Sequence, residues 1–447
     1  MITDTICAVS TPVGTGALAL IRVSGNDAIK EVNKIFKGKN LEKAKSHTVH
    51  YGHLLNEDGT FLDEVMVSVL RAPKTFTRED MVEISIHGGM LLTQKVLERL
   101  LKLDMRLARP GEFSERAYLN GRIDLVQAEA IMDVIHAKNI NALKIASLGL
   151  TQETSKLIKN LRDKLVNVIA QIEVNIDYPE YDDAVVMSKE IIYPATLEIL
   201  KDMKYLLEHS YQNQLIRDGI STAIIGKPNV GKSSLLNALL NEDKAIVTDI
   251  AGTTRDTIEA ELNLGGITLK LIDTAGIRDT DDVIEKIGVE RSLKALDKAQ
   301  LVLVVLDQSR PLDEIDYRLL EAAKKKPSVV ILNKDDLESQ IDVAGIKISA
   351  LQKQGFRELE AKILEVLSLT NLEERDFNYL SNTRHIAKVN DAIKSLENVL
   401  ESINLDMPVD IYAIDLTNAW QSLGDIIGVR YQDELLDTLF SKFCLGK

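Results

Sequence analysis

The segment Gly226-Lys-Pro-Asn-Val-Gly-Lys-Ser233 constrains the fold of this 447-residue chain more than any other feature. It matches a phosphate-binding loop at every fixed position, between a strand-like stretch that ends at Ile225 and a helical pattern from Leu235 to Leu240. Glycines in such a loop let backbone N–H groups converge on phosphate oxygens at a helix N-terminus. Lys232 supplies positive charge for the β- and γ-phosphates, and Ser233 offers Mg²⁺ a hydroxyl ligand. The sequence therefore predicts a nucleotide-binding α/β domain.

Three further motifs follow in the order that GTP-binding domains use. Asp273-Thr-Ala-Gly276 ends a predicted strand, where an aspartate can hold the magnesium shell and a glycine N–H can meet the γ-phosphate. Asn333-Lys-Asp-Asp follows a second strand, and Asp335 can accept both N–H groups of guanine. Ser349-Ala350 follows a third strand, within reach of the base. Together these motifs resemble those of GTPases.

The segment from Thr248 to Asp256 corresponds to a first switch. Its Thr254 is the predicted second hydroxyl ligand of Mg²⁺, beside Ser233. The residues predicted to surround GTP are Asn229, Val230, Gly231, Lys232, Ser233, Ser234, Thr248, Asp249, Ile250, Ala251, Gly252, Thr253, Thr254, Asp273, Thr274, Ala275, Gly276, Asn333, Lys334, Asp335, Ser349 and Ala350.

The residue after Asp-Thr-Ala-Gly is Ile277, where many GTPases carry a glutamine that orients the attacking water. Isoleucine cannot do this, so another group has to position the water. Glu285 is a candidate, although other acidic residues lie close to it in the sequence. The missing positive charge has two candidate sources. One is a monovalent cation beside the phosphates, bound with the help of Asn229, and the other is an arginine, Arg255 or Arg278.

The composition is that of a globular protein with a net charge of −14, from 54 basic and 68 acidic residues. Such a charge argues against a protein that coats nucleic acid without specificity, although one local basic patch remains open. The two cysteines, Cys7 and Cys444, lie at opposite ends and cannot form a disulfide framework. No targeting signal or membrane-length apolar run is evident. We therefore expect a cytoplasmic protein.

The pattern of predicted helices and strands along the chain indicates three domains. Residues 1–118 mix strands and helices in an α+β domain, which includes an expected helix over 26–36. Residues 119–215 and 371–447 are helical, and apolar residues such as Ile158, Leu161 and Leu165 recur every three or four positions. Residues 216–370 alternate strand and helix. We interpret this as one helical domain, split by an inserted α/β domain. Two independent helical segments are the alternative.

With these motifs, the chain resembles the MnmE (TrmE) family of tRNA modification GTPases over its whole length. The most specific matches are Ala108-Arg-Pro-Gly-Glu-Phe-Ser-Glu-Arg-Ala117 and the terminal Phe443-Cys-Leu-Gly-Lys447. The resemblance implies a multidomain α+β and α/β fold. Its parts would be a folate-binding N-terminal domain that dimerises, a helical bundle and an inserted Ras-like P-loop GTPase domain.

The resemblance also implies a reaction and partners. The family acts with an FAD-containing flavoprotein, MnmG (GidA), in a complex of both proteins. Together they add a carboxymethylaminomethyl or aminomethyl group to C5 of the wobble uridine of certain tRNAs. A 5-formyl- or methylene-tetrahydrofolate supplies the one-carbon unit. GTPase domains of two subunits meet across K⁺, which activates hydrolysis.

Site residues carry over by position. The resemblance assigns Glu285 to orienting the water, and Lys232 is the second predicted catalytic residue. It implies potassium ligands Asn229, Thr248, Ile250 and Thr253, with Ile250 acting through its carbonyl. It implies folate contacts Arg22, Glu79, Arg122 and Lys447. At Arg122 this chain departs from the family pattern, in which many relatives carry lysine.

Three other functions remain open from the sequence. A ribosome-assembly or RNA-binding GTPase would share the phosphate loop, but it usually carries a basic module after the GTPase domain. A folate enzyme with a regulatory GTPase is a second alternative, and a scaffold controlled by its GTP cycle is a third. The role of Cys444 is also left open, between catalysis and packing near a docked C-terminus.

Overall fold

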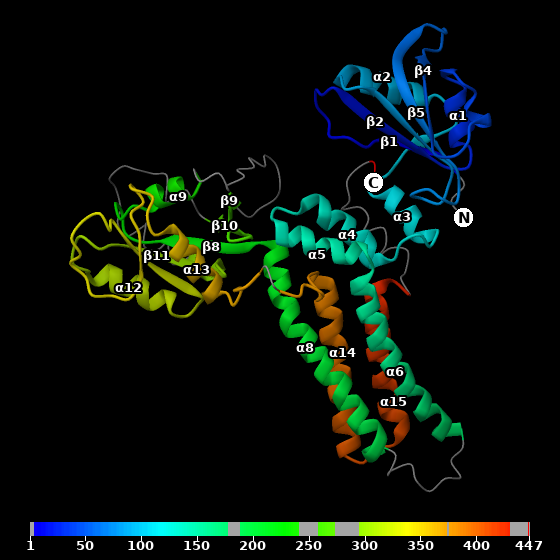
Figure 1. Ribbon diagram of the computed structural model, residues 1–447. Coiled ribbons are helices and arrows are strands. Elements are labelled where there is room, and N and C mark those ends of the chain that lie inside the picture. The colour runs from blue at the N-terminus through cyan, green and yellow to red at the C-terminus, as the bar shows by residue number, and fades with distance from the viewer. Residues whose placement is uncertain are drawn as a thin grey trace. The chain divides into compact units, whose positions relative to one another are not determined.

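The computed structural model describes residues 4–177, 188–240, 258–272, 295–372, 375–429 and 446. The chain divides into two compact units, one of residues 1–132 with 424–447 and one of residues 133–423. Figure 1 shows the chain coloured from end to end. Across the described residues, no helix combines the length and apolarity needed to cross a membrane.

The first unit is built on a seven-stranded sheet with the order β3-β4-β5-β6-β2-β1-β7. Most neighbours are antiparallel, and β7 pairs parallel to β1. Alternate strand residues and the apolar faces of α1 and α2 form one core, with Ile21, Val67 and Ile84 fully buried. The elements are β1 Ile6–Val9, β2 Leu18–Ser24, α1 Ala28–Asn33, β3 Phe36–Gly38, β4 Thr48–Leu55, β5 Phe61–Leu70, β6 Met81–His87, α2 Met90–Leu101, β7 Arg106–Leu107 and α3 Glu112–Leu119.

The helix expected over residues 26–36 is too long. Helix α1 ends at Asn33, and Phe36 begins β3. Phe36 pairs with Leu54 on β4, and its side chain is buried. Pairing with a strand that lies further along the chain therefore outweighs the local helical pattern.

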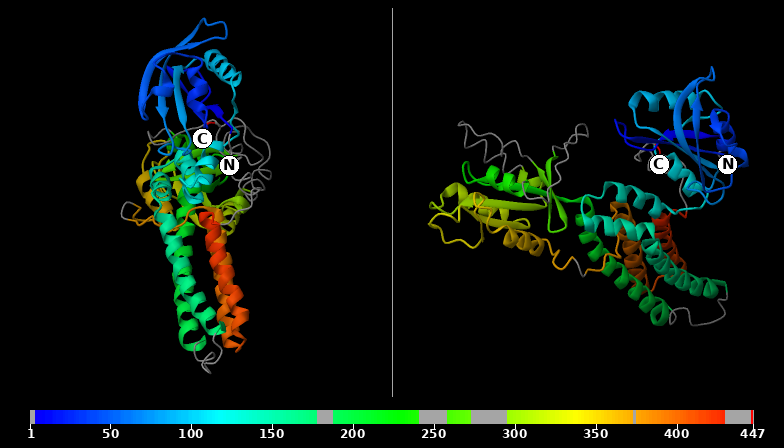
Figure 2. Two further views of the ribbon diagram at one scale, coloured as in Figure 1. Left: turned by 90° about the vertical axis from the view of Figure 1, so that its right-hand side faces the viewer. Right: turned by 45° about the horizontal axis from the view of Figure 1, so that its top comes forward.

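Long helices dominate the second unit, and α6, α8, α14 and α15 lie side by side in Figures 1 and 2. The expected amphipathic stripe is confirmed on α6, where Ile158 and Leu165 are fully buried. The helices are α4 Leu125–His136, which crosses from the first unit, α5 Ile140–Leu150, α6 Glu153–Asp177, the short π-helix Ser188–Ile192, α8 Tyr193–Asp218, α14 Thr383–Asn404 and α15 Val409–Ile427.

Helix α8 leads into a six-stranded sheet with the order β13-β12-β11-β8-β10-β9, from which the chain continues to α14. All strand pairs are parallel except β9 with β10. Two apolar clusters cover the sheet, one on each face, and all seven residues of β11 are buried. The elements are β8 Ile220–Ile225, α9 Lys232–Leu240, β9 Ile258–Leu264, β10 Ile267–Ile272, β11 Leu301–Asp307, α12 Glu314–Ala323, β12 Ser328–Asn333, β13 Ile346–Lys347 and α13 Phe356–Val366.

The predicted mixture of α+β, helical and α/β parts is confirmed. A mostly parallel sheet with both faces covered places its ligand site at the carboxyl ends of the strands. The loops that follow β8, β11 and β12 therefore lie at the edge where a ligand site is expected.

Candidate functional site

The loop between β8 and α9 needs glycine at two positions. A Cβ on Gly226 would lie 2.4 Å from the carbonyl oxygen of Val305, and one on Gly231 would lie 2.1 Å from Nδ2 of Asn333. Both glycines have positive φ, +154° and +96°. Asn229 also adopts a left-handed φ of +62°. This backbone turns sharply just before α9, which is the geometry that aims N–H groups at an anion.

Lys232 folds back over the same loop. Its Nζ donates to the carbonyl oxygens of Gly226 (2.8 Å) and Lys227 (2.6 Å). Burial lowers the pKa of Lys232 to about 8, because these neutral carbonyls compensate poorly for lost water. A phosphate is a better partner for the ammonium group than a carbonyl. Ser233 and Ser234 follow in the first turn of α9.

Lys227 fixes the loop to a second element. Its Nζ lies 2.7 Å from carboxylate oxygens of both Asp313 and Asp316. These two aspartates form the capping box of α12, in which Asp313 accepts from the N–H groups of Ile315 and Asp316. The phosphate loop is thereby held against the start of α12.

Asn333 joins three loops through one buried side chain. Its Nδ2 donates to the carbonyl oxygen of Val230 at 2.9 Å, and its Oδ1 accepts from the N–H of Ala350 at 3.1 Å. The side chain is 2% exposed. The predicted phosphate loop and the two predicted guanine motifs therefore meet at Asn333.

The guanine motifs are ordered by side-chain contacts. Lys334, with a φ of +70°, donates to Asp307 at 2.6 Å. Asp336 accepts from the hydroxyl of Ser349 at 2.5 Å. Asp335, the residue between Lys334 and Asp336 in the sequence, is exposed at the surface. An exposed carboxylate can accept hydrogen bonds from the N–H edge of a base.

The structure thus brings together half of the residues predicted to surround GTP. They are Asn229, Val230, Gly231, Lys232, Ser233, Ser234, Asn333, Lys334, Asp335, Ser349 and Ala350. The other predicted residues lie outside the described part of the chain. These are Thr248, Asp249, Ile250, Ala251, Gly252, Thr253, Thr254, Asp273, Thr274, Ala275, Gly276 and Glu285, together with the alternatives Arg255 and Arg278.

A second polar site lies in the first unit, where two predicted folate residues meet on one ring. The guanidinium carbons of Arg22 and Arg122 lie 5.7 and 5.2 Å from the ring centroid of Phe76. Arg22 also pairs with Glu83 at 2.7 Å and donates to the carbonyl oxygen of Gly446 at 3.4 Å. Residue 446 thus contacts Arg22, while Lys447 and Cys444 lie outside the described residues.

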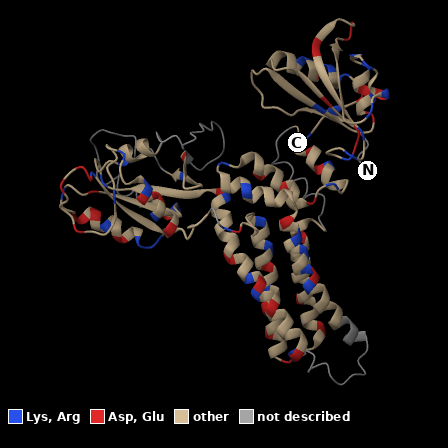
Figure 3. Cartoon of the chain, in the orientation of Figure 1, with Lys and Arg blue, Asp and Glu red and all other residues tan. Residues whose placement is uncertain are grey.

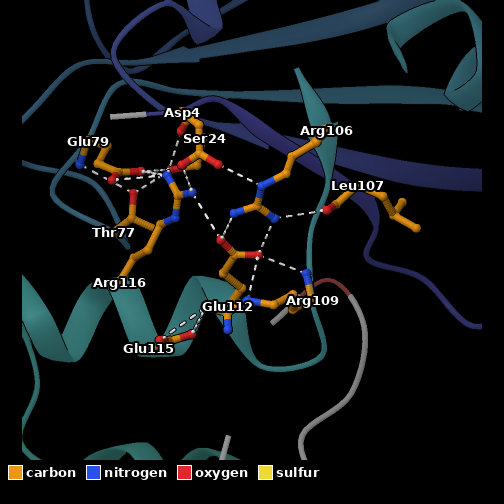
Figure 4. A network of polar contacts seen from close by, with 10 residues as sticks. All are labelled: Asp4, Ser24, Thr77, Glu79, Arg106, Leu107, Arg109, Glu112, Glu115 and Arg116. Carbon is orange, nitrogen blue, oxygen red and sulfur yellow. Dashed lines mark hydrogen bonds and ion pairs between the residues drawn. The ribbon is translucent and has the colours of Figure 1, made fainter. Parts of the chain in front are cut away.

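Glu79 belongs to the adjacent buried network shown in Figure 4. Its carboxylate accepts from Nη1 of Arg116 at 3.2 Å and from the hydroxyl of Ser24 at 2.8 Å. Arg116 is 1% exposed and also contacts Asp4 and Glu112. Glu79 therefore compensates the charge of the buried Arg116, and its own side chain is still 11% exposed. Each carboxylate oxygen has two lone pairs, so capacity remains for a ligand.

Comparison with known proteins decides the family. A family model described as the MnmE helical domain matches residues 125–444, and one described as the GTP-binding protein TrmE N-terminus matches residues 5–122. A protein of Acholeplasma laidlawii named tRNA modification GTPase MnmE is 61% identical over 99% of each chain. The chain belongs to the MnmE family. An MnmE protein of Aster yellows witches'-broom phytoplasma is 54% identical over 100% of each chain.

One solved structure similar to this MnmE-family chain is the G domain of the T. maritima FeoB iron transporter. The two are 29% identical, the match covers 33% of this chain and 98% of that one, and the TM-score is 0.25.

Sequence reasoning missed several contacts of this MnmE-family site. No sequence pattern marks Lys227 as an anchor, although Asp313 three residues before Asp316 is a recognisable capping signal for the helix that Lys227 contacts. Phe76 carries no sequence signal, because an isolated aromatic residue in a loop belongs to no motif. The contact of Asn333 with Val230 spans 103 residues, and no local pattern signals it.

Proposed function

We propose that this chain is a GTPase that acts in tRNA modification. The observation that carries the proposal is 61% identity over 99% of the chain to a relative of that name, together with three nucleotide-site loops joined at Asn333. In the proposed site, Asp335 accepts the two N–H groups of guanine. The ammonium group of Lys232 leaves the carbonyls of its own loop and pairs with the β- and γ-phosphates.

Magnesium fits the proposed site. Ser233 stands in the first turn of α9, directly after the phosphate loop, and a hydroxyl is a hard oxygen ligand of the kind Mg²⁺ takes. We assign Thr254 as its second hydroxyl ligand. When bound, the metal neutralises charge on the phosphate oxygens. The protein's own part is to hold the phosphates with loop N–H groups and with Lys232.

We further propose that hydrolysis depends on K⁺ and on pairing of two GTPase domains. Asn229 lies at the exposed tip of the loop in a left-handed conformation, so its amide oxygen is available as a hard ligand. Thr248, the Ile250 carbonyl and Thr253 would complete the potassium set. Because Ile277 cannot orient water, we assign that role to Glu285.

The first unit is proposed to bind a tetrahydrofolate. Two arginines on the Phe76 ring suit the carboxylates of folate, and the 11% exposed Glu79 suits the N–H groups of a pterin. The contact between Arg22 and Gly446 supports a role for the neighbouring Lys447. We propose that the chain acts as a homodimer with the flavoprotein MnmG on the wobble uridine of tRNA.

A reconstituted reaction tests this function. Full-length protein is combined with an MnmG flavoprotein, unmodified tRNA, methylene-tetrahydrofolate and GTP, and the wobble nucleoside is measured by mass spectrometry. We expect modification by the wild type and its loss in Lys232→Gln and Arg122→Ala. The matched control Arg122→Lys keeps the charge and should retain activity. Modification that needs neither GTP nor folate would contradict the proposal. A ribosomal-subunit assembly defect in depleted cells whose tRNA is fully modified would favour the RNA-binding GTPase.

A further inference from the structure

Gln308 is a buried amide at the carboxyl end of β11. Its side chain is 1% exposed. Its backbone is fixed on both sides, because its N–H donates to the Asn333 carbonyl at 3.2 Å and its own carbonyl accepts from the N–H of Gln340 at 2.8 Å. From this fixed position, Nε2 of Gln308 donates to Oδ1 of Asp335 at 2.8 Å. The amide therefore reaches from the core to the exposed carboxylate that is proposed to read guanine.

The orientation of this amide is determined by its neighbour. An ionised carboxylate only accepts hydrogen bonds, so the donor end of the amide has to face Asp335. The other end, Oε1, has no hydrogen-bond partner among the residues that the structure describes. A buried unpaired amide oxygen is destabilising. Packing alone therefore does not account for a glutamine here, and its one side-chain hydrogen bond in this structure goes to Asp335.

Each carboxylate in this corner of the sheet has its own donor. Asp307 accepts from Lys334, and Asp336 accepts from Ser349. Gln308 is the corresponding donor for Asp335. Because these donors are engaged elsewhere, none of them substitutes directly for the Gln308 amide.

We propose that Gln308 is a positioning residue that holds the Asp335 carboxylate in the plane of the base and thereby sets selectivity for guanine. The inference rests on the proposed GTP site, in which Asp335 reads the base. Rotation about χ2 of an aspartate is broad, so a free carboxylate samples many planes. Guanine presents two N–H groups in one plane, and bidentate pairing needs the carboxylate in that plane. The hydrogen bond to Oδ1 restricts the rotation and leaves Oδ2 and one lone pair of Oδ1 for the base.

The test compares GDP with IDP, whose base lacks the 2-amino group. The dissociation constants of both are measured for full-length wild type and Gln308→Met by displacement of a fluorescent GDP. Loss of one ordering hydrogen bond should weaken GDP about three- to tenfold. IDP should weaken less, because it offers one N–H group and needs no fixed plane. The ratio of the IDP dissociation constant to the GDP dissociation constant therefore falls, while kcat at saturating GTP stays unchanged.

Two variants frame the result. Gln340→Ala removes an exposed amide of the neighbouring segment and keeps the backbone N–H that supports Gln308, so it should behave as wild type. Gln308→Glu keeps the shape but replaces the donor with a second carboxylate. It should weaken GDP more than Gln308→Met, and it provides the measurement if Gln308→Met does not fold. If Gln308→Met leaves the ratio of the IDP to the GDP dissociation constant unchanged, so that both nucleotides lose affinity equally or not at all, the inference is overturned.

Asp335→Asn separates this inference from the proposed function. An amide in place of the carboxylate should reverse preference from GDP to XDP, whose base carries an oxygen at the 2-position. If Asp335→Asn leaves base preference unchanged, Asp335 is not the reader and the proposed site itself fails. If Asp335→Asn switches preference while Gln308→Met keeps the wild-type ratio, only the role of Gln308 is wrong.

Discussion

Arg116 is a guanidinium group with 1% exposure, so its charge is almost fully removed from water. Three carboxylates compensate for this, those of Asp4, Glu79 and Glu112, and Glu112 is itself fully buried. Buried ion pairs contribute little net stability when complete. Removing one partner is costly, because the other charge stays buried without compensation. The network in Figure 4 is therefore sensitive to single substitutions.

Glu112→Gln is expected to destabilise the region around α3 by about 3 kcal/mol at neutral pH, since it removes one of the three carboxylates that compensate the buried Arg116 charge. Burial raises the pKa of the Glu112 carboxyl, but hydrogen bonds from two arginines and the Arg109 N–H outweigh burial and bring the pKa to about 2. The folded pKa is below the ordinary value of 4.5, so the stabilisation is complete above pH 4.5 and is lost as the pH falls towards 2. Hydrogen exchange of the α3 amides, corrected for intrinsic rates, measures both effects.

Glu98→Gln is the control for Glu112→Gln. Glu98 pairs with Lys95 on the exposed face of α2, where solvent screens the charges. Loss of this ion pair should leave the hydrogen exchange of the α3 amides unchanged. Equal protection of α3 in the wild type and Glu112→Gln between pH 5 and pH 7 would contradict the argument, since that interval lies above the ordinary carboxyl pKa of 4.5.

At the scale of elements, the hairpin of β9 and β10 packs on the start of α5. Lys138 pairs with Glu261, and Asn139, the N-cap of α5, donates to Thr268 at 3.0 Å. Asn141 donates to the carbonyl oxygen of Gly266 in the hairpin turn at 3.0 Å. The sheet and the helices of the second unit are therefore joined by polar contacts at this turn.

Gly266→Ala should loosen this junction. The residue has a φ of +78°, which costs about 1 kcal/mol for alanine, and its Cβ would lie 2.5 Å from Nδ2 of Asn141. We expect faster hydrogen exchange in β10 and at the start of α5. In an Asn141→Ala background, Gly266→Ala should destabilise the protein only through its backbone strain, because the clash with the Asn141 side chain is gone. A double-mutant cycle measures this difference.

Gly59→Ala is the matched control, because Gly59 has a φ of +79° and its Cβ would meet no described atom within 4 Å. It should loosen only its own turn between β4 and β5. If Gly266→Ala also affects only its own turn, the contact with Asn141 does not join the two elements.

The same elements mark the limit of sequence-based prediction. The phosphate loop and the stripe on α6 were predictable, because each is a local pattern with its own physical cause. The end of α1 was not, because Phe36 is drawn into a strand by Leu54. Asn333 was recognised from its motif, but its role in joining loops was not, and Gln308 carried no signal because its partner lies 27 residues away.

At the scale of the whole molecule, charge is divided unevenly along the chain. The first 132 residues hold 17 basic and 17 acidic residues, whereas the rest hold 37 and 51, which accounts for the net −14. Figure 3 shows both signs interspersed along the long helices. The proposed tRNA substrate is a polyanion, so contact with it is least opposed at the neutral N-terminal part. This fits a division of labour in which the proposed flavoprotein partner would supply much of the tRNA contact.

The potassium proposal predicts a property of paired molecules. GTP hydrolysis by the full-length protein should be much faster in potassium than in sodium buffer at matched ionic strength, and its rate per molecule should rise with protein concentration as GTPase domains pair. Asn229→Ala should lose the preference for potassium, because it removes an amide ligand from the loop. Asn237→Ala removes an exposed amide from α9 and should keep it. Glu285→Ala should slow hydrolysis in both salts while leaving GTP affinity intact.

Equal wild-type rates in the two salts, independent of concentration, would rule out the potassium mechanism. The catalytic charge would then have to come from Arg255 or Arg278, and substitution of each to alanine would identify which.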